Sequence, residues 1–340
     1  MSSTQLDTQP SNQIRVWMYE RMIRSRAFEE ALQAAYFEDK LPAFNMAKGP
    51  LPGEIHFSAG QEPVAAGVCA ALGADDIVTT AHRPHHVAVA RDVNFNKLCL
   101  ELFQKAGGLS EGRGGHMHLY DKAVNFSCSS IVGESMGATA GMALALKMQK
   151  RPGVAVTVIG EGAVNQGVWH EAMNMAALWK LPFICVIEDN YYGVTVSKAE
   201  STAIERNSDR ASAYGCAGEY VEGNDADLVY AAMVRAVERA RAGGGPTIVE
   251  VQTARLLGHY AGDQNAYVPD DIKEKYFKDA LPGYRERLIA GGVAESDLET
   301  LEQAVRAEVT AAVAAAKDAP YAPGEAALDK VFATQLQDAS

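Results

Sequence analysis

Carboxylate and amide side chains follow two apolar segments of the sequence, where they could bind a metal ion. Glu161 comes after the β-branched segment 154–159, and Asn190 comes after the apolar segment 183–188. The spacing between Glu161 and Asn190 matches one crossover between neighbouring parallel strands, so both are expected at the same edge of a sheet. Their oxygens suit Mg²⁺, which usually keeps phosphate or water among its ligands. Because a buried charge is costly without a partner, we predict a cation here.

Two glycines beside this acid indicate that an anion binds at the same place. Gly160 and Gly162 flank Glu161 and allow the backbone to approach a ligand closely. The N-terminus of a helix expected over 164–180 also favours an anion. The pattern therefore predicts a diphosphate group bridged by a metal ion. On the local sequence alone, the alternative is a capped turn followed by an unrelated acidic loop.

Apolar segments and helical patterns alternate along the chain and must position these residues. The expected helices include 14–40, 135–149 and 164–180, and the expected strands include 154–159, 183–188 and 247–253. Continuous apolar strands that alternate with helices are typical of parallel strands buried on both faces. We therefore predict an α/β fold with an open parallel sheet, helices on both faces, and ligands beyond the carboxyl ends of the strands.

The chain is expected to contain one α/β domain with additions at both ends. We assign residues 1–13 to a flexible N-terminus, 14–270 to the α/β domain and 271–340 to a C-terminal helical extension. The extension is charged and rich in alanine, so it could be a solvated surface or a contact with a partner chain or a second copy. No internal repeat or low-complexity linker interrupts the sequence.

Composition restricts the partners and the compartment. A net charge of -12 argues against nucleic acid or an anionic membrane as the main partner. The five cysteines are scattered without a CxxC pair, which suits a reducing compartment. The N-terminal segment lacks the pattern of a signal peptide, and no apolar run reaches the roughly 18 residues of a membrane helix. We therefore expect a soluble, cytoplasmic protein.

Several motifs spread along the chain form a longer pattern with the two apolar segments. They are the segment 160–193, "HFSAGQEP" (56–63), "AHRPHH" (81–86), "GRGGHMHL" (112–119), "SIVGESMG" (130–137) and "RLLGHYAGD" (255–263). Together these motifs resemble those of the α subunits of E1 components in the 2-oxo acid and acetoin dehydrogenase complexes, which use thiamine diphosphate. The resemblance covers about residues 20–270. It implies a thiamine diphosphate-binding fold, of which this chain would form the diphosphate-binding domain.

The resemblance implies roles for individual residues. The metal ligands would be Glu161, Asn190 and the carbonyl group of Tyr192. Arg83 would pair with phosphate oxygens, which its planar guanidinium suits. The other cofactor-binding positions would be His82, Val132, Gly160, Gly162 and Ala163. The catalytic positions would be His56, His85 and His259, which would surround the diphosphate and the substrate entrance.

Several residues depart from the family pattern around the cofactor. Glu161 stands where the family usually has aspartate, and Mg²⁺ requires ligand distances of ~2.0–2.1 Å. The expected cation is therefore Mg²⁺ or a more tolerant ion such as Ca²⁺ or Mn²⁺. Asp189 adds a second acid that could offset a poorer ligand at position 161. His82, His86 and Ser130 replace the usual tyrosine, glycine and glycine.

The resemblance implies an α subunit of a thiamine diphosphate-dependent E1 dehydrogenase. It would cleave acetoin, a related acyloin or a 2-oxo acid such as pyruvate, and pass the acyl unit to a lipoyl-bearing E2 protein. It would need an E1 β subunit, with which it would form an α₂β₂ heterotetramer. The extension 271–340 would contact the β subunit or a second copy of the chain. The motif "GHYAGD" (258–263) favours acetoin, and 259–271 is expected to be a mobile loop over the site.

Two other hypotheses remain open from the sequence. The chain could be a structural or regulatory α-like subunit that has lost its metal site, because Glu161 is unusual. It could also be an E1 component with an unusual substrate. A nicotinamide-dependent dehydrogenase is disfavoured, because no GxGxxG follows a strand.

Overall fold

The structure is a computed structural model that describes residues 8–42 and 44–328. The flexible segment predicted over 1–13 therefore lies partly outside the described residues, as does the end of the predicted extension 271–340. Among the described helices, none combines the length and the apolar character that crossing a membrane requires.

A seven-stranded sheet forms the centre of the molecule. Its strands are β1 (Ile77–Thr80), β2 (Tyr120–Asp121), β3 (Phe126–Cys128), β4 (Ala155–Gly160), β5 (Phe183–Asp189), β8 (Ala217–Val221) and β9 (Thr247–Gln252). They lie in the order β2-β3-β1-β4-β5-β9-β8, and every neighbouring pair is parallel except β2 and β3. A separate antiparallel pair, β6 (Tyr192–Gly193) and β7 (Val196–Ser197), follows β5.

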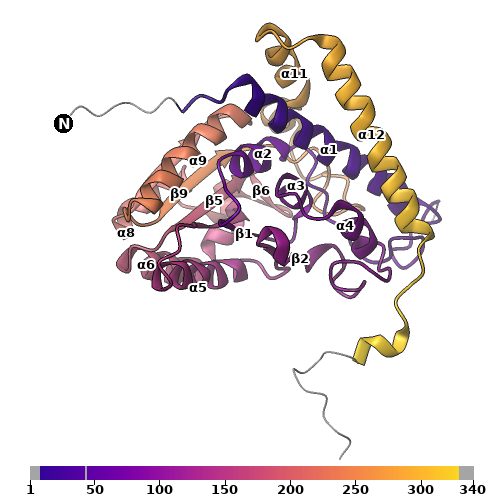
Figure 1. The fold of residues 1–340 in the computed structure, drawn as a ribbon, viewed down its shortest axis with the longest axis horizontal. Helices are drawn as coiled ribbons and strands as arrows, with labels where there is room; N and C mark the ends of the chain where they lie inside the picture. The colour runs from indigo at the N-terminus through magenta and orange to yellow at the C-terminus, as the bar shows by residue number, and fades with distance from the viewer. Residues whose placement is uncertain (1–7, 43, 329–340) are drawn as a thin grey trace, which may run out of the picture.

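Alternate residues of the central strands face two different cores. Val156 and Ile184 belong to the core formed with α1 (Asn12–Phe37), α2 (Glu62–Ala70) and α9 (Ala226–Arg241). Ile159 and Cys185 belong to the core formed with α5 (Glu134–Met148) and α6 (Gly167–Leu178). Figure 1 shows α5 and α6 on the opposite side of the sheet from α2 and α9. The predicted open parallel sheet with helices on both faces is therefore confirmed.

Local contacts explain two differences between predicted and observed helices. Helix α1 begins at Asn12, because the Ser11 side chain caps it by accepting a hydrogen bond from the Ile14 N–H. The helix predicted over 164–180 begins at Gly167 instead, because the chain first forms the 3₁₀ turn η3 (Glu161–Asn165). The backbone directly after β4 therefore belongs to this turn and not to the N-terminus of α6.

The C-terminal helices pack on the α/β domain of the same chain. They are α10 (Asp270–Tyr276), α11 (Leu281–Ala290) and α12 (Glu295–Asp318), and α12 lies along α1 (Figure 1). Val305 and Val309 of α12 are buried in the same core as α1. An ion pair between Arg306 and Glu30, 2.7 Å apart, also joins the two helices. Contact of this extension with a partner subunit stays a prediction.

Short elements connect these layers. They are α3 (His85–Ala90), α4 (Phe95–Leu102), α7 (Lys198–Ser201), α8 (Ala211–Tyr214) and the 3₁₀ turns η1 (Gly115–Met117), η2 (Lys122–Val124), η4 (Asn207–Arg210) and η5 (Gly324–Leu328). The register of β4 and β5 pairs Gly160 with Glu188. Glu161 and Asn190 therefore leave neighbouring strands at the same carboxyl edge, as predicted.

Candidate functional site

A cavity of about 300 Å³ lies at the carboxyl ends of the central parallel strands. The predicted site residues that line it are His82, Arg83, Val132, Gly160, Glu161, Gly162, Ala163, Asn190, Tyr192 and His259. They come from segments that are far apart in the sequence, and the sheet brings them together. The structure thus gathers most of the predicted site around one cavity.

Glu161 and Asn190 form a buried group of oxygens in this cavity. The Asn190 backbone N–H donates to Glu161 Oε2 at 3.3 Å, and both residues are buried. The Asn190 Oδ1 atom has no hydrogen-bond partner among the described residues. Burial, with the nearby charge of Asp189, raises the pKa of Glu161 to about 7. A buried acid with a raised pKa beside an unpartnered amide oxygen suits a divalent cation.

Asp189 lies next to this group but contacts other residues. Its carboxylate is ion-paired with Lys198 and accepts the Tyr191 N–H at 3.1 Å. Lys198 also contacts Glu250, whose Oε1 lies 2.8 Å away. Asp189 is not among the residues that line the cavity. The second acid therefore acts on Glu161 through its charge and does not replace it at the cavity surface.

Two buried arginines line the same cavity. Arg83 donates to the carbonyl oxygens of Phe57 and His259, the latter at 2.9 Å, and Arg255 donates to the Tyr267 hydroxyl at 3.1 Å. In the part of the chain that the structure describes, neither guanidinium is ion-paired with a carboxylate. Burial and the charge of Arg255 lower the pKa of Arg83 to about 10, so Arg83 stays protonated at neutral pH. Two buried guanidiniums without a carboxylate suit a multiply charged anion.

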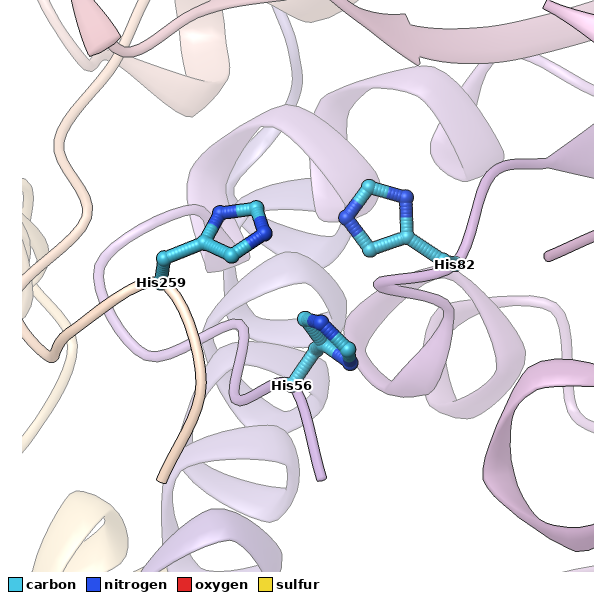
Figure 2. A group of neighbouring side chains, drawn as sticks. All are labelled: His56, His82 and His259. Carbon is cyan, nitrogen blue, oxygen red and sulfur yellow. The ribbon is translucent and has the colours of Figure 1, made fainter. Parts of the chain in front are cut away.

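Three histidines meet beside the arginines. Figure 2 shows His56, His82 and His259 pointing toward one another from three separate segments, and one ring nitrogen of each lies within 4.8 Å of the others. Burial and the charge of Arg83 lower the pKa of His82 to about 3 and that of His259 to about 4. The same causes place the pKa of His56 far below its usual value. The cluster is therefore neutral at pH 7.

His85 lies apart from the cavity. Its side chain is fully buried at the start of α3, and its Nδ1 atom lies 2.9 Å from Glu29 Oε1. Neither His85 nor His56 is among the cavity-lining residues, and His85 also lies outside the cluster that His56 forms with His82 and His259. The predicted catalytic role of His85 would have to act through other residues.

Acidification is expected to destabilise the folded chain through His82. Its pKa is 6.5 ordinarily and about 3 when folded, so the unfolded chain binds the proton more tightly. The contribution of His82 to stability is present above pH 6.5 and is lost as the pH falls toward 3. In this window it should lower the free energy of unfolding by about 1.4 kcal/mol per pH unit. The free energy of unfolding, measured with urea at pH 6.5 to 4.5, should fall less steeply with falling pH for His82→Gln than for the wild type. An equally steep fall in both proteins would contradict this.

Further residues that the sequence did not single out also line the cavity, and three of them have amide or charged side chains. These three are Gln61, Glu188 and Arg255. Gln61 and Arg255 lie within motifs that carried the family resemblance, and Glu188 precedes Asp189 at the end of β5. The position of Gln61 and Arg255 within those motifs was the signal that could have identified them as site residues. The Gln61 Oε1 atom is buried without a hydrogen-bond partner among the described residues, which suits contact with a ligand.

The cavity has the space and the donors that a metal-bound diphosphate needs. A Cβ atom added at Gly160 or Gly162 would meet no other atom within 4 Å, so the backbone there borders open space. Glu161 and Asn190 offer oxygens to a cation, and the arginines offer hydrogen-bond donors to an anion. The residues present therefore fit thiamine diphosphate together with a divalent cation.

A parallel sheet that carries groups for a cation and an anion at its carboxyl edge is typical of enzymes that bind a phosphorylated cofactor. Residues 20–325 match the family described as "Dehydrogenase E1 component", and the chain therefore belongs to this family. The family that the motifs predicted is thus confirmed.

Several curated relatives resemble the chain over most of its length. The α subunit of an acetoin:2,6-dichlorophenolindophenol oxidoreductase from Bacillus subtilis is 37% identical over 93% of both chains. The protein with the same description from Cupriavidus necator is 34% identical over 93% of both chains. The pyruvate dehydrogenase E1 component subunit alpha from Zymomonas mobilis is 35% identical over 90% of this chain and 85% of its own. All three relatives are described as α subunits, and the third is described as the α subunit of an E1 component.

Proposed function

We propose that this chain is the diphosphate-binding α subunit of a thiamine diphosphate-dependent dehydrogenase that cleaves acetoin or a related acyloin. The observation that carries the proposal is the cavity that combines two kinds of binding group. The Glu161 and Asn190 oxygens suit a cation, and the Arg83 and Arg255 guanidiniums suit an anion. The similarity to two acetoin oxidoreductase α subunits supports acetoin over pyruvate or another 2-oxo acid.

The residues of the cavity divide between the parts of the cofactor. Glu161, Asn190 and the Tyr192 carbonyl would hold Mg²⁺, or a more tolerant Ca²⁺ or Mn²⁺ ion. The two arginines and the backbone N–H groups of Gly162 and Ala163 would hold the diphosphate. Val132, His82 and Gly160 would border the rest of the molecule. When bound, thiamine diphosphate supplies an electron sink for breaking a bond beside a carbonyl group.

Two partners complete this proposal. An E1 β subunit would form an α₂β₂ heterotetramer with this chain, and the extension 271–340 is a candidate contact. A lipoyl-bearing E2 protein would accept the acyl unit. The described exposed side of α12 is rich in charged residues, which suits a polar contact more than a large apolar one.

The function is tested on the chain produced together with an E1 β subunit. With thiamine diphosphate and Mg²⁺, the complex should reduce 2,6-dichlorophenolindophenol in the presence of acetoin, with kcat/KM at least about 10-fold above that for pyruvate. The chain alone should show no activity above background. Calorimetry that detects neither cofactor binding nor metal retention by the complex would favour a structural α-like subunit.

A further inference from the structure

The three residues predicted to hold the cation lie on three separate elements beside the cavity. Glu161 begins the turn η3, Asn190 follows β5, and Tyr192 begins β6. The first two follow neighbouring parallel strands, and the pairing of these strands fixes how far apart they lie. The third ligand would be a backbone carbonyl group on the hairpin formed by β6 and β7. Its position therefore depends on the contacts that hold this hairpin.

The hairpin has little packing of its own and an unfavourable backbone conformation. Its residues 193–196 are exposed, and a two-stranded hairpin is at best marginally stable alone. Val194 has a φ of 55°, in the left-handed region where a β-branched residue is rare, and Tyr191 has a φ of 70°. Such a conformation persists only where the surrounding structure holds it.

Lys198 links the end of this hairpin to the central sheet. It directly follows β7, and its ammonium group is ion-paired with Asp189 at the end of β5 and with Glu250 in β9, the latter at 2.8 Å. Both carboxylates are buried, and the Lys198 side chain is only 11% exposed. In the part of the chain that the structure describes, neither carboxylate is ion-paired with another basic side chain.

Hydrogen bonds extend this link to both sides of the predicted cation site. The Lys198 N–H donates to the Tyr191 carbonyl oxygen at 2.8 Å, and the Tyr191 N–H donates to Asp189 Oδ1 at 3.1 Å. At the other end of α7, the Asn165 side chain of η3 donates to the Ser201 carbonyl oxygen at 3.1 Å. Helix α7 therefore joins the hairpin to the end of β5 and to the turn η3.

We propose that Lys198 is a positioning residue, which holds the Tyr192 carbonyl group in place for the cation and so favours Mg²⁺ over Ca²⁺. Mg²⁺ requires near-ideal octahedral geometry, whereas Ca²⁺ accepts a flexible arrangement of ligands. Lys198 does not line the cavity, so it acts through the hairpin. The inference rests on the proposed function and deepens it, because it names a residue that sets the choice of cation.

A purely electrostatic role for Lys198 predicts the opposite result. Its ammonium group is a positive charge near a cation site, so its removal alone should strengthen cation binding. Loss of a residue that positions a metal ligand instead weakens binding, by about 10- to 100-fold. The direction of the change in Mg²⁺ affinity therefore separates the two roles.

The test measures metal binding by the metal-free α–β complex in saturating thiamine diphosphate. Isothermal titration calorimetry gives dissociation constants for Mg²⁺ and for Ca²⁺. Lys198→Met should bind Mg²⁺ about 10-fold more weakly but Ca²⁺ less than about 3-fold more weakly. Lys198→Arg keeps the positive charge for both carboxylates and should stay within about 3-fold of the wild type for both ions.

Lys147→Met is the matched control. Lys147 also links two elements, because its ammonium group on α5 donates to the Trp179 carbonyl oxygen at the end of α6. It does not line the cavity, so both dissociation constants should be unchanged in this variant.

A double variant covers the case in which Lys198→Met leaves two buried charges that prevent assembly. Asp189→Asn combined with Lys198→Met removes one negative and one positive charge, so the net charge of the group does not change. Glu250 still accepts the Ser208 N–H at 2.8 Å. The link is lost, so Mg²⁺ should again bind about 10-fold more weakly. Without metal or cofactor, amide hydrogen exchange over 194–198 should be at least about 10-fold faster, with exchange in α9 unchanged.

Three results would overturn the proposal. The first is an unchanged or higher affinity of Lys198→Met for Mg²⁺. The second is an equal loss of affinity for Mg²⁺ and Ca²⁺, which would indicate general destabilisation. The third is unchanged hydrogen exchange over 194–198 in the double variant. A wild-type complex that binds neither ion in the presence of thiamine diphosphate would instead contradict the proposed function itself.

Discussion

Replacing Glu161 with alanine is expected to weaken the binding of Mg²⁺ and thiamine diphosphate to the α–β complex by at least about 100-fold. The carboxylate is buried directly after β4, and burial together with the charge of Asp189 raises its pKa to about 7. A divalent cation would stabilise the ionised carboxylate, and the cation in turn would hold the diphosphate. Isothermal titration calorimetry of wild-type and Glu161→Ala complexes measures the change.

Two matched variants separate metal binding from folding. Glu161→Asp keeps the charge and shortens the side chain, so cofactor binding should be preserved or improved. Glu161→Gln keeps the volume and removes the charge. Because folding raises the pKa of this acid from 4.5 to about 7, its ionised form destabilises the folded chain above pH 7. Without cofactor at pH 8, Glu161→Gln should therefore be more heat-stable than the wild type. Normal cofactor binding by Glu161→Ala would show that the cation is held elsewhere.

The placement of Glu161 and Asn190 could be predicted because it depends on a regular feature of the chain. Apolar runs mark β4 and β5 as strands buried on both faces, and parallel pairing brings their carboxyl ends to one edge. A residue one or two positions after the end of β4 must then lie near a residue at the same distance after the end of β5. This reasoning needs only the periodicity of the sequence and the length of the crossover.

Irregular or edge segments were harder to predict. Strand β8 was missed, because its sequence "AGEYV" contains Gly218 and Glu219 and lacks the apolar run of a central strand. It lies at the edge of the sheet, where one neighbour and partial exposure remove the need for such a run. The turn η3 was also missed, since a 3₁₀ turn and the first turn of an α-helix have similar sequence patterns.

The state of each histidine could not be predicted from its residue type. His85 and His86 are neighbours in one motif, yet both are buried beside carboxylates, at Glu29 and Glu188, and neither lines the cavity. The Nδ1 atom of His56 lies 3.1 Å from the Nε2 atom of His116, which is 60 residues away in the sequence. Such contacts arise only when loops from separate strand ends meet. The sequence thus predicts the location of this site better than its chemistry.

The second large effect is expected at Arg83. Replacing it with methionine should weaken the binding of thiamine diphosphate by about 1000-fold, because two charge-assisted hydrogen bonds to phosphate oxygens are lost. The side chain is buried beside Arg255, without an ion pair to a carboxylate in the described part of the chain, so its charge is available to the ligand. Arg83→Lys keeps the charge but lacks the planar pair of donors, and a loss of about 10-fold is expected.

Arg83 also has a structural contact, and the experiment must separate it from phosphate binding. Its guanidinium donates to the carbonyl oxygens of Phe57 and His259, so its loss could move the loop that carries His259. Calorimetry with both thiamine diphosphate and unphosphorylated thiamine distinguishes the two roles. If Arg83 binds phosphate, Arg83→Met should lose affinity for the diphosphate alone, and raised salt should weaken the wild type more than the variant. Equal losses for both ligands would mean that Arg83 acts by holding the loop, since thiamine carries no phosphate for it to contact.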